Sequence, residues 1–232
     1  MKLSIICHIF MLLIHCIFNL SSSNNDYPIL DLEFNKCSNL ELTPAITEDL
    51  LTQLFVELRR QFQLVYNISI QRSSVVDLDS STPKKFSRHW ILHLPNGELF
   101  SSGYEVGVFV KGLVSRLEEE GEAGDLQLSG HALLANNLFV NAEVSEEADA
   151  KKLMRFTDLV VYAHNRIFRL MGSTKFGKQP DAALCIAEAN KFPFPHGFDN
   201  TKFYLPEMSR RLKNDSGAND AENADTVSPI LI

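Results

Sequence analysis

"PILDLEF", residues 28–34, alternates apolar side chains with the two acids Asp31 and Glu33. A period of two is typical of a β-strand with one buried face. On a strand, residues i and i+2 point to the same side, so both carboxylates would emerge together, whereas on a helix they would diverge by about 200°. We expect a strand here. Its acids indicate either a site for a hard cation such as Mg²⁺ or Mn²⁺, or an exposed acidic strand face.

Two amphipathic helices are expected after this strand. Thr43-Pro44 provides an N-cap and a proline at the first helical position, and the first helix should end near Asn67. Both helices have apolar residues at helical spacing, which predicts that each covers one face of a sheet. The apolar faces comprise Ile46, Leu50, Leu51, Leu54, Phe55, Leu58, Phe62 and Val65 in the first helix, and Val106, Phe109, Val110, Leu113, Val114 and Leu117 in the second.

The remaining strands are expected to be short and bounded by turn residues, such as Pro95-Asn96-Gly97. They lie at residues 75–78, 90–94, 159–162, 167–170 and 182–187, the third and fourth as a pair. The acidic stretch at residues 118–125 has the pattern of an exposed loop. These elements predict an α+β fold with helices packed on a sheet.

The composition is that of one soluble globular domain, with 232 residues, 45% hydrophobic and 22% charged. A net charge of −7 disfavours nucleic-acid binding by the chain as a whole. Between Lys151 and Lys178, however, seven basic residues accompany the single acid Asp158. A local basic surface for phosphate groups is therefore compatible with the acidic total.

The N-terminal segment is a mostly apolar run that follows Lys2 and has the pattern of a secretory signal peptide or an anchor helix. A glycosylated extracellular protein is thus one alternative, and it would use the sequons at Asn19, Asn67 and Asn214. No two of the four cysteines form a C-x-x-C pair. We expect Cys37 and Cys185 to be free thiols in a reducing compartment.

A second group of functional candidates is the basic stretch at residues 84–89. By the same period-two rule, Lys85, Ser87 and His89 share one face of a strand. An ammonium, a hydroxyl and an imidazole that converge would form a cradle for phosphate. The alternative is a solvated basic strand edge.

The third group centres on Asp158, which we expect at the head of a buried strand. A carboxylate in that position is costly unless it is paired or binds a metal. Arg169 and Lys175 would bring positive charge toward the same site, which suits a triphosphate. The alternative is a structural ion pair between Asp158 and one of the arginines.

In this order, the three groups resemble the motifs of the archaeo-eukaryotic primase superfamily. The local sequence around them is most similar to that of eukaryotic primase-polymerases. The similarity spans Leu30 to Phe194. The matching stretches are "LDLEFNK" (30–36), "LDSSTPKKFSRH" (78–89), "VGVFVKGL" (106–113) and "FTDLVVYAHNRIFRLMGSTKFGK" (156–178).

The resemblance implies an RRM-like mixed or antiparallel sheet and a defined set of site residues. Asp31, Glu33 and Asp158 would be the catalytic acids and would bind two divalent ions, Mn²⁺ or Mg²⁺. The residues implied to bind the incoming nucleotide and its phosphates are Lys85, Ser87, His89, Arg166, Arg169 and Lys175.

The implied reaction is in-line attack of a 3′-hydroxyl on the α-phosphate of a dNTP or NTP, directed by a single-stranded DNA template that holds a primer. The implied setting is DNA replication and damage tolerance, by repriming and translesion synthesis, in the nucleus and mitochondrion. No membrane is expected, and single-stranded-DNA-binding proteins would bind regions that this chain lacks. The alternative location is the secretory pathway, if residues 1–23 are a true signal peptide.

The sequence departs from the family pattern at both ends. Family members carry an extended N-terminal module and a C-terminal zinc-binding module, whereas thirty residues precede Asp31 here and no comparable Cys/His cluster occurs, so we expect no zinc. Residues 1–25 are expected to be signal-like or a gene-model artefact. Residues 26–208 would form a catalytic core that is incomplete at its N-terminus, and residues 209–232 a disordered acidic tail. The alternative function is a catalytically impaired fragment that binds single-stranded DNA or nucleotide.

Overall fold

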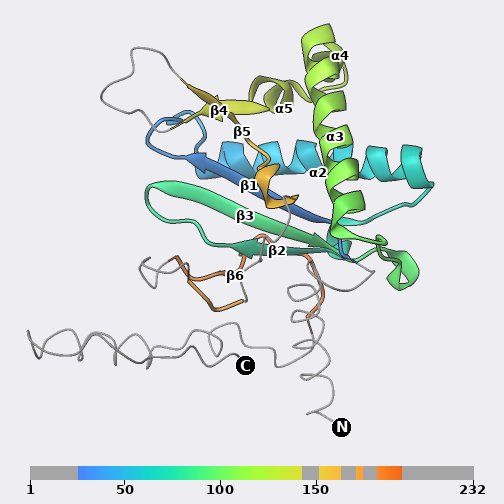
Figure 1. The fold of residues 1–232 in the computed structure, drawn as a ribbon. Helices are drawn as coiled ribbons and strands as arrows, with labels where there is room; N and C mark the ends of the chain where they lie inside the picture. The colour runs from blue at the N-terminus through green and yellow to red at the C-terminus, as the bar shows by residue number, and fades with distance from the viewer. Residues whose placement is uncertain (1–25, 143–151, 163–170, 175–181, 195–232) are drawn as a thin grey trace, which may run out of the picture.

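The computed structural model describes residues 26–142, 152–162, 171–174 and 182–194. They form an α+β fold with a four-stranded antiparallel sheet of strand order β1-β3-β2-β6, covered on one face by α2 and α3 (Figure 1). A second, two-stranded sheet pairs β4 with β5. The strands are β1 (Ile29–Asn35), β2 (Val75–Asp79), β3 (Lys85–Leu92), β4 (Phe139–Asn141), β5 (Leu153–Arg155) and β6 (Cys185–Ile186). The helices are α2 (Pro44–Tyr66), α3 (Gly103–Ala123), α4 (Asp125–Leu128) and α5 (Ala132–Asn136), with the 3-10 turns η1 (Arg72–Ser74), η2 (Pro95–Gly97) and η3 (Val160–Tyr162).

Helix α2 has the ends that its sequence predicts, and α3 is capped at both ends by local residues. The Thr43 hydroxyl accepts a hydrogen bond from the Ile46 N–H at 3.4 Å, and Asn67 ends α2 in the left-handed region at φ 55°. Helix α3 starts at Ser102, whose hydroxyl accepts from the Glu105 N–H, and it ends at Gly124 with φ 83°. Local capping therefore sets the length of each helix.

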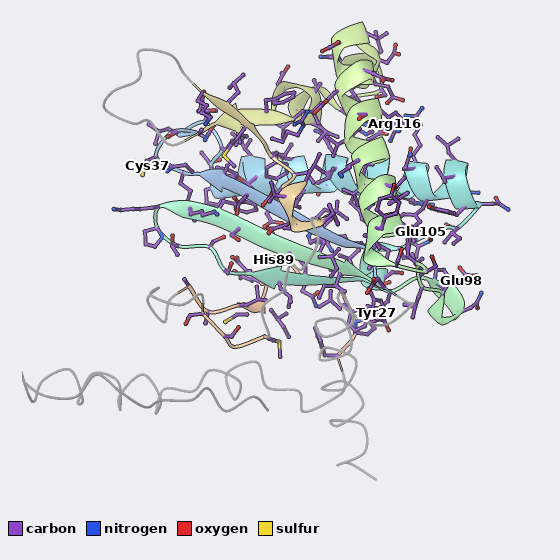
Figure 2. The ribbon with its side chains drawn as sticks, viewed as in Figure 1. Tyr27, Cys37, His89, Glu98, Glu105 and Arg116 are labelled. Atoms are coloured by element: carbon purple, nitrogen blue, oxygen red, sulfur yellow. The ribbon has the colours of Figure 1, made fainter. Side chains whose placement is uncertain are left out.

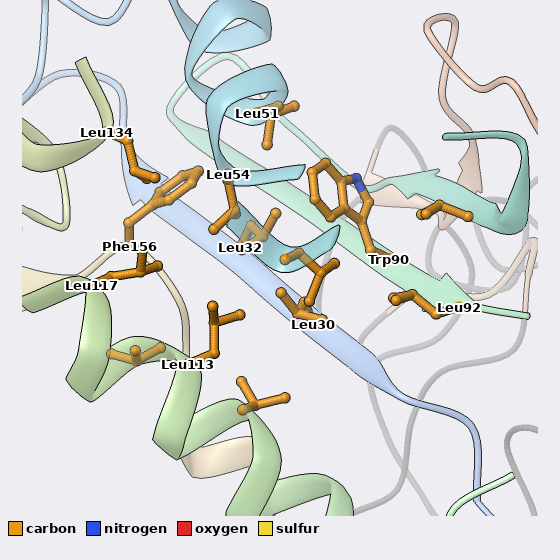
Figure 3. Packing of buried hydrophobic residues seen from close by; sticks show 14 of the residues in the cluster. Leu30, Leu32, Leu51, Leu54, Trp90, Leu92, Leu113, Leu117, Leu134 and Phe156 are labelled. Carbon is orange, nitrogen blue, oxygen red and sulfur yellow. The ribbon is translucent and has the colours of Figure 1, made fainter. Parts of the chain in front are cut away.

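The main core lies between the sheet and the two long helices. Leu30 and Leu32 of β1 and Trp90 of β3 point to this side, where they meet Leu54 of α2 and Leu113 of α3 (Figure 3). Each of these side chains is at most 1% exposed. Replacing one such leucine with alanine typically lowers the free energy of unfolding by about 2–5 kcal/mol.

A buried charge cluster lies on the same, helix-covered face of β2 and β3. The guanidinium of Arg88 contacts carboxylates of Asp77 at 3.2 Å, Asp79 at 3.1 Å and Glu48 at 2.7 Å. Asp77 is completely buried and is also paired with Arg72. Burial alone would lower the pKa of Arg88, but the carboxylates, Asp77 first, raise it. These charges are mutually neutralised, so the cluster joins β2, β3 and the start of α2.

Within the part of the chain that the structure describes, the other face of the sheet is covered only in part. A small apolar cluster buries Ile29, Val76, Leu78, Ile91 and Leu184 there. Of these, Leu184 comes from the segment that leads into β6, which extends the sheet beyond β2. Asp31 and Glu33 lie on the β1 side of this face, away from β6, and the Asp158 N–H binds the edge of the same strand.

The expected bounds of β3 and the expected loop at residues 118–125 are corrected. Strand β3 begins at Lys85 and ends at Leu92, not at residues 90–94, because it pairs with β1 from Lys85 to Ile91 and with β2 from Arg88 to Leu92. Residues 118–125 are helical rather than a loop: α3 continues to Ala123, and Glu118 is paired with Arg155 at 2.7 Å.

Residues 159–162 do not form a strand either. A carboxylate oxygen of Asp158 accepts the Val160 N–H at 2.8 Å, and the chain turns into η3. The predicted partner strand at residues 167–170 lies outside the described residues. The strand expected at residues 182–187 is present as the shorter β6. In α2, Ile46 and Val65 are expected on the covered apolar face, but they are 37% and 51% exposed.

Several predictions about the ends of the chain stay predictions. Residues 1–25 and 209–232 lie outside the described ranges, so the signal-like segment and the acidic tail are untested, as is the 26–208 boundary. Among the described residues, no helix is both long and apolar enough to cross a membrane. Cys37 and Cys185 are free thiols, as predicted.

Candidate functional site

The first two predicted groups face each other across the β1–β3 pair. Asp31 is opposite His89, and Glu33 is opposite Ser87. Directly opposed residues of antiparallel strands point to the same face, so both acids and both nucleotide-binding candidates lie on the face away from α2 and α3. Figure 2 labels His89 within this sheet. The period-two prediction for these residues is confirmed, and Lys85 joins them from the start of β3.

Asp31, Ser87 and His89 are buried, with exposed fractions of 7%, 6% and 8%. The Nδ1 atom of His89 lies 3.6 Å from a carboxylate oxygen of Asp31. This distance is too long for a direct hydrogen bond but close enough for a strong electrostatic interaction when the imidazole is protonated.

Glu33 and Lys85 form an ion pair at the more open end of the site. The Lys85 side chain is 43% exposed, so its ammonium can reach both the carboxylate and the solvent. A flexible lysine of this kind is a mobile positive charge. Its ammonium can pair with the Glu33 carboxylate or with a phosphate group of a bound nucleotide.

Ser87 is held by two serines that the sequence analysis did not single out. The Ser80 hydroxyl donates to the Ser87 hydroxyl at 3.0 Å, and the Ser87 N–H donates to the Ser81 hydroxyl at 3.0 Å. Both lie in the turn between β2 and β3. The pair of serines before Thr82-Pro83 is the only sequence signal for them, and such pairs are common in turns.

Backbone hydrogen bonds to the outer edge of β1 place Asp158 beside Asp31 and Glu33. Its N–H donates to the Asp31 carbonyl at 2.8 Å, and the Glu33 N–H donates to the Phe156 carbonyl at 3.0 Å. An isolated bridge joins Leu32 to the residue before Asp158. The chain thus brings the third predicted acid, distant in sequence, to the strand that carries the other two.

Tyr162 is a further residue of this site that the sequence analysis missed. Its hydroxyl donates to the Ile29 carbonyl on β1. Burial, and then the negative charges of Asp31 and Asp158, raise the pKa of Tyr162 well above its usual value. No spacing signal identifies it, because it lies in an apolar run that has the pattern of a strand.

The donor set suits a hard divalent cation, since carboxylate oxygens are the ligands that Mg²⁺ and Mn²⁺ prefer. Within the described ranges, however, no three His, Cys, Asp or Glu side chains are already arranged as a metal site. Glu33 is engaged with Lys85, and an oxygen of Asp158 accepts the Val160 N–H. The backbone brings the three acids together, and cation binding would require rotation of side chains.

The phosphate-binding candidates of the third group remain predictions. Arg166, Arg169 and Lys175 lie outside the described residues. Of the basic residues between 151 and 178, Lys152 and Arg155 are described, and Arg155 is paired with Glu118.

A cavity of about 730 Å³ opens elsewhere, between the start of α2 and the β2–β3 turn. Its charged lining includes Lys36, Glu48, Asp79 and Arg88, and none of the predicted site residues. Arg88 is neutralised by Asp79 and Glu48, and Lys36 donates to the Thr82 carbonyl at 2.9 Å. Arg88 and Lys36 of this cavity are therefore engaged by groups of the protein itself.

The fold and the site define an α+β protein with carboxylates and basic groups gathered on the less covered face of its sheet. No family model matches the chain. The chain is 37% identical to the DNA-directed primase/polymerase protein of Danio rerio over 176 residues, which cover 70% of this chain and 32% of that protein. It is 30% identical to the Homo sapiens protein of that name over 209 residues, 71% of this chain and 36% of the relative, and 27% identical to the Gallus gallus protein over 224 residues.

Over this region the chain is similar to the DNA-directed primase/polymerase proteins, which confirms the resemblance of its motifs. The chain spans about a third of the length of the curated relatives it matches.

Proposed function

We propose that this chain carries most of the catalytic core of a metal-dependent nucleotidyltransferase, a DNA-directed primase-polymerase. The observation that supports this most is the β1–β3 register, which puts Asp31 and Glu33 opposite His89 and Ser87 while Asp158 pairs with the edge of β1. The names of the relatives point to the same class of enzyme. On this proposal, the antiparallel sheet is the RRM-like core of the archaeo-eukaryotic primase superfamily.

In the proposed site, Asp31, Glu33 and Asp158 hold the divalent ions, Mn²⁺ or Mg²⁺. When bound, two such ions would lower the pKa of an attacking 3′-hydroxyl and neutralise charge on the reacting phosphate and the leaving oxygens. Asp31 is held rigidly, because it is nearly buried and its carbonyl accepts the Asp158 N–H. Glu33 is more exposed and exchanges its contact with Lys85 for a contact with a cation.

Lys85, Ser87 and His89 bind the incoming nucleotide. Three carboxylates repel a triphosphate, so the nucleotide needs positive charge on the protein as well as cations. Lys85 supplies one such charge at the open end of the face, and the turn serines orient the Ser87 hydroxyl as a hydrogen-bond partner. Arg166, Arg169 and Lys175 are assigned to the phosphates by the resemblance alone.

The proposed substrates are a dNTP or NTP and a primer on a single-stranded DNA template. The metal-binding acids do not distinguish bases, so base choice comes from pairing with the template. The proposed setting is DNA replication and damage tolerance, including repriming and translesion synthesis, in the nucleus and mitochondrion. These finer assignments rest on the resemblance to primase-polymerases.

The test is template-dependent primer extension by the full chain with Mn²⁺ or Mg²⁺. We expect incorporation by the wild type and none by the double variant Asp31→Ala, Glu33→Ala. The matched control replaces two exposed acids, Glu41→Ala with Asp49→Ala, and should retain incorporation. Incorporation that survives loss of both site acids contradicts the proposal. Salt-sensitive DNA binding without turnover, even at high Mn²⁺, would instead support a catalytically impaired binding protein.

A further inference from the structure

The third acid of the site is tied to the sheet on one side only. The bridge at Leu32 and the hydrogen bond from the Asp158 N–H to the Asp31 carbonyl fix the chain before and at Asp158. Immediately afterwards the chain leaves β1 and turns into η3. The placement of the Asp158 carboxylate therefore depends on what holds the chain beyond it.

Tyr162 provides that second attachment. Its hydroxyl donates to the carbonyl of Ile29, two residues before Asp31 on the same strand. Carbonyls of residues i and i+2 point the same way on a strand, so Asp158 and Tyr162 bind successive carbonyls along the outer edge of β1. The segment between them forms a short loop closed at both ends.

The Tyr162 hydroxyl is suited to this role because a phenol O–H is a hydrogen-bond donor. Burial, and then the nearby charges of Asp31 and Asp158, raise its pKa well above its usual value.

The ring of Tyr162 lies directly against the backbone of α3 at Gly107. A Cβ at position 107 would be 2.9 Å from the Tyr162 Cβ and 3.3 Å from its Cγ. These two atoms are the rigid base of the tyrosine side chain and cannot swing aside. Glycine is unfavourable within a helix, and the close approach gives a physical reason for it here.

We propose that Tyr162, seated on Gly107, is a positioning residue that holds Asp158 beside Asp31 for cation binding; this inference rests on the proposed function. The contact links the site to α3, which otherwise packs on the opposite face of the sheet. Tyr162 touches neither the nucleotide nor the cation. It acts through Asp158.

The first test replaces Tyr162→Phe in the full chain and measures Mn²⁺ binding by calorimetry. Partners that orient metal ligands typically contribute about 10- to 100-fold to metal affinity, so we expect a rise of about tenfold in the dissociation constant. In primer extension, the half-saturating Mn²⁺ concentration should rise similarly, while the rate at saturating Mn²⁺ is retained. The matched control is Tyr104→Phe on the exposed side of α3, where the side chain is 78% exposed.

The second test compares two glycines of the same helix. Gly107→Ala pushes against the base of Tyr162, whereas Gly112→Ala has no atom within 4 Å of the added carbon. We expect weaker Mn²⁺ binding for the first variant and unchanged binding for the second. Thermal unfolding establishes that each variant is folded. If Gly107→Ala does not fold, the Tyr162→Phe measurement decides alone.

The outcomes distinguish this inference from the proposed function. If Asp31→Asn loses Mn²⁺ binding but Tyr162→Phe keeps wild-type affinity, the positioning role of Tyr162 is wrong and the metal site stands. If Tyr162→Phe loses maximal rate without any change in the Mn²⁺ dependence, the residue is merely structural and the inference is also wrong. Wild-type protein that binds no Mn²⁺ overturns both proposals.

Discussion

Two buried aspartates on the strands that flank β3, Asp77 on β2 and Asp31 on β1, have opposite surroundings. Asp77 points to the helix-covered face and is paired with both Arg72 and Arg88. Asp31 points to the other face, next to an imidazole and with two further acids close by along β1 and its edge. An acid that serves stability is surrounded by cations of its own protein, whereas an acid that binds a cation has other acids for neighbours.

The largest change in stability is expected when the charges around Asp77 are unbalanced. Arg88→Met leaves Asp77 buried with only Arg72 for compensation, and breaking a buried pair in this way costs about 3–5 kcal/mol. Urea denaturation measures the free energy of unfolding. A loss under about 1 kcal/mol, the usual value of an exposed pair, would mean that the cluster adds little to stability.

Asp31→Asn should have the reverse effect, with little loss of stability and a complete loss of activity. The change removes one charge from a group of acids, which relieves repulsion, so we expect the free energy of unfolding to stay within about 1 kcal/mol of the wild type or to rise. Template-dependent incorporation should be lost. The same denaturation series and primer-extension assay apply, and a variant that is strongly destabilised would place Asp31 in the same structural class as Asp77.

The contribution of His93, which follows β3 on the same face of the sheet as Asp31, to the free energy of unfolding is expected to depend on pH. Burial lowers the pKa of His93, whose ring packs in a tilted arrangement against Tyr27 and Phe192, at 4.8 and 4.9 Å between centroids. The folded state therefore favours the neutral imidazole. The stability that this group contributes is present above the unfolded pKa of about 6.5 and is lost as the pH falls toward the lowered folded value. His93→Phe should flatten the decline in unfolding free energy between about pH 7 and pH 5, and an unchanged slope would contradict this.

The smallest effect is expected at an ion pair that belongs to neither face. Arg155 and Glu118 are 2.7 Å apart, but the arginine side chain is 47% exposed. Such pairs contribute about 0–1 kcal/mol, so Arg155→Gln should change the free energy of unfolding by less than about 1 kcal/mol. This variant calibrates the larger values, and a loss comparable to that of Arg88→Met would refute the distinction between buried and exposed pairs.

Amphipathic periodicity made the helices and the first strand predictable. In α2 and α3 the apolar spacing, the caps and the turn residues agree, and the strand at residues 28–34 has a clean alternation. The same alternation predicted that Asp31 and Glu33 share a face, and that Lys85, Ser87 and His89 do so. The side-by-side placement of these two groups could not be predicted from spacing, because it depends on the register of strands separated by about fifty residues.

The segment after Asp158 shows why the rest was not predictable. Residues 159–162 have strand propensity, but the Asp158 carboxylate accepts a local N–H and starts a turn instead. Tyr162 then packs against Gly107, a contact between residues far apart in sequence. Tertiary contacts thus override local propensity at the part of the chain that carries the third acid.

The central claim is that Asp31, Glu33 and Asp158 together bind divalent cations. Anomalous diffraction at the manganese edge, from crystals of the chain grown with Mn²⁺ and a nucleoside triphosphate, tests it most directly. We predict manganese in contact with carboxylates of all three acids and within about 2.0–2.6 Å of their oxygens. Manganese bound only elsewhere, with Glu33 still paired to Lys85, would contradict the claim.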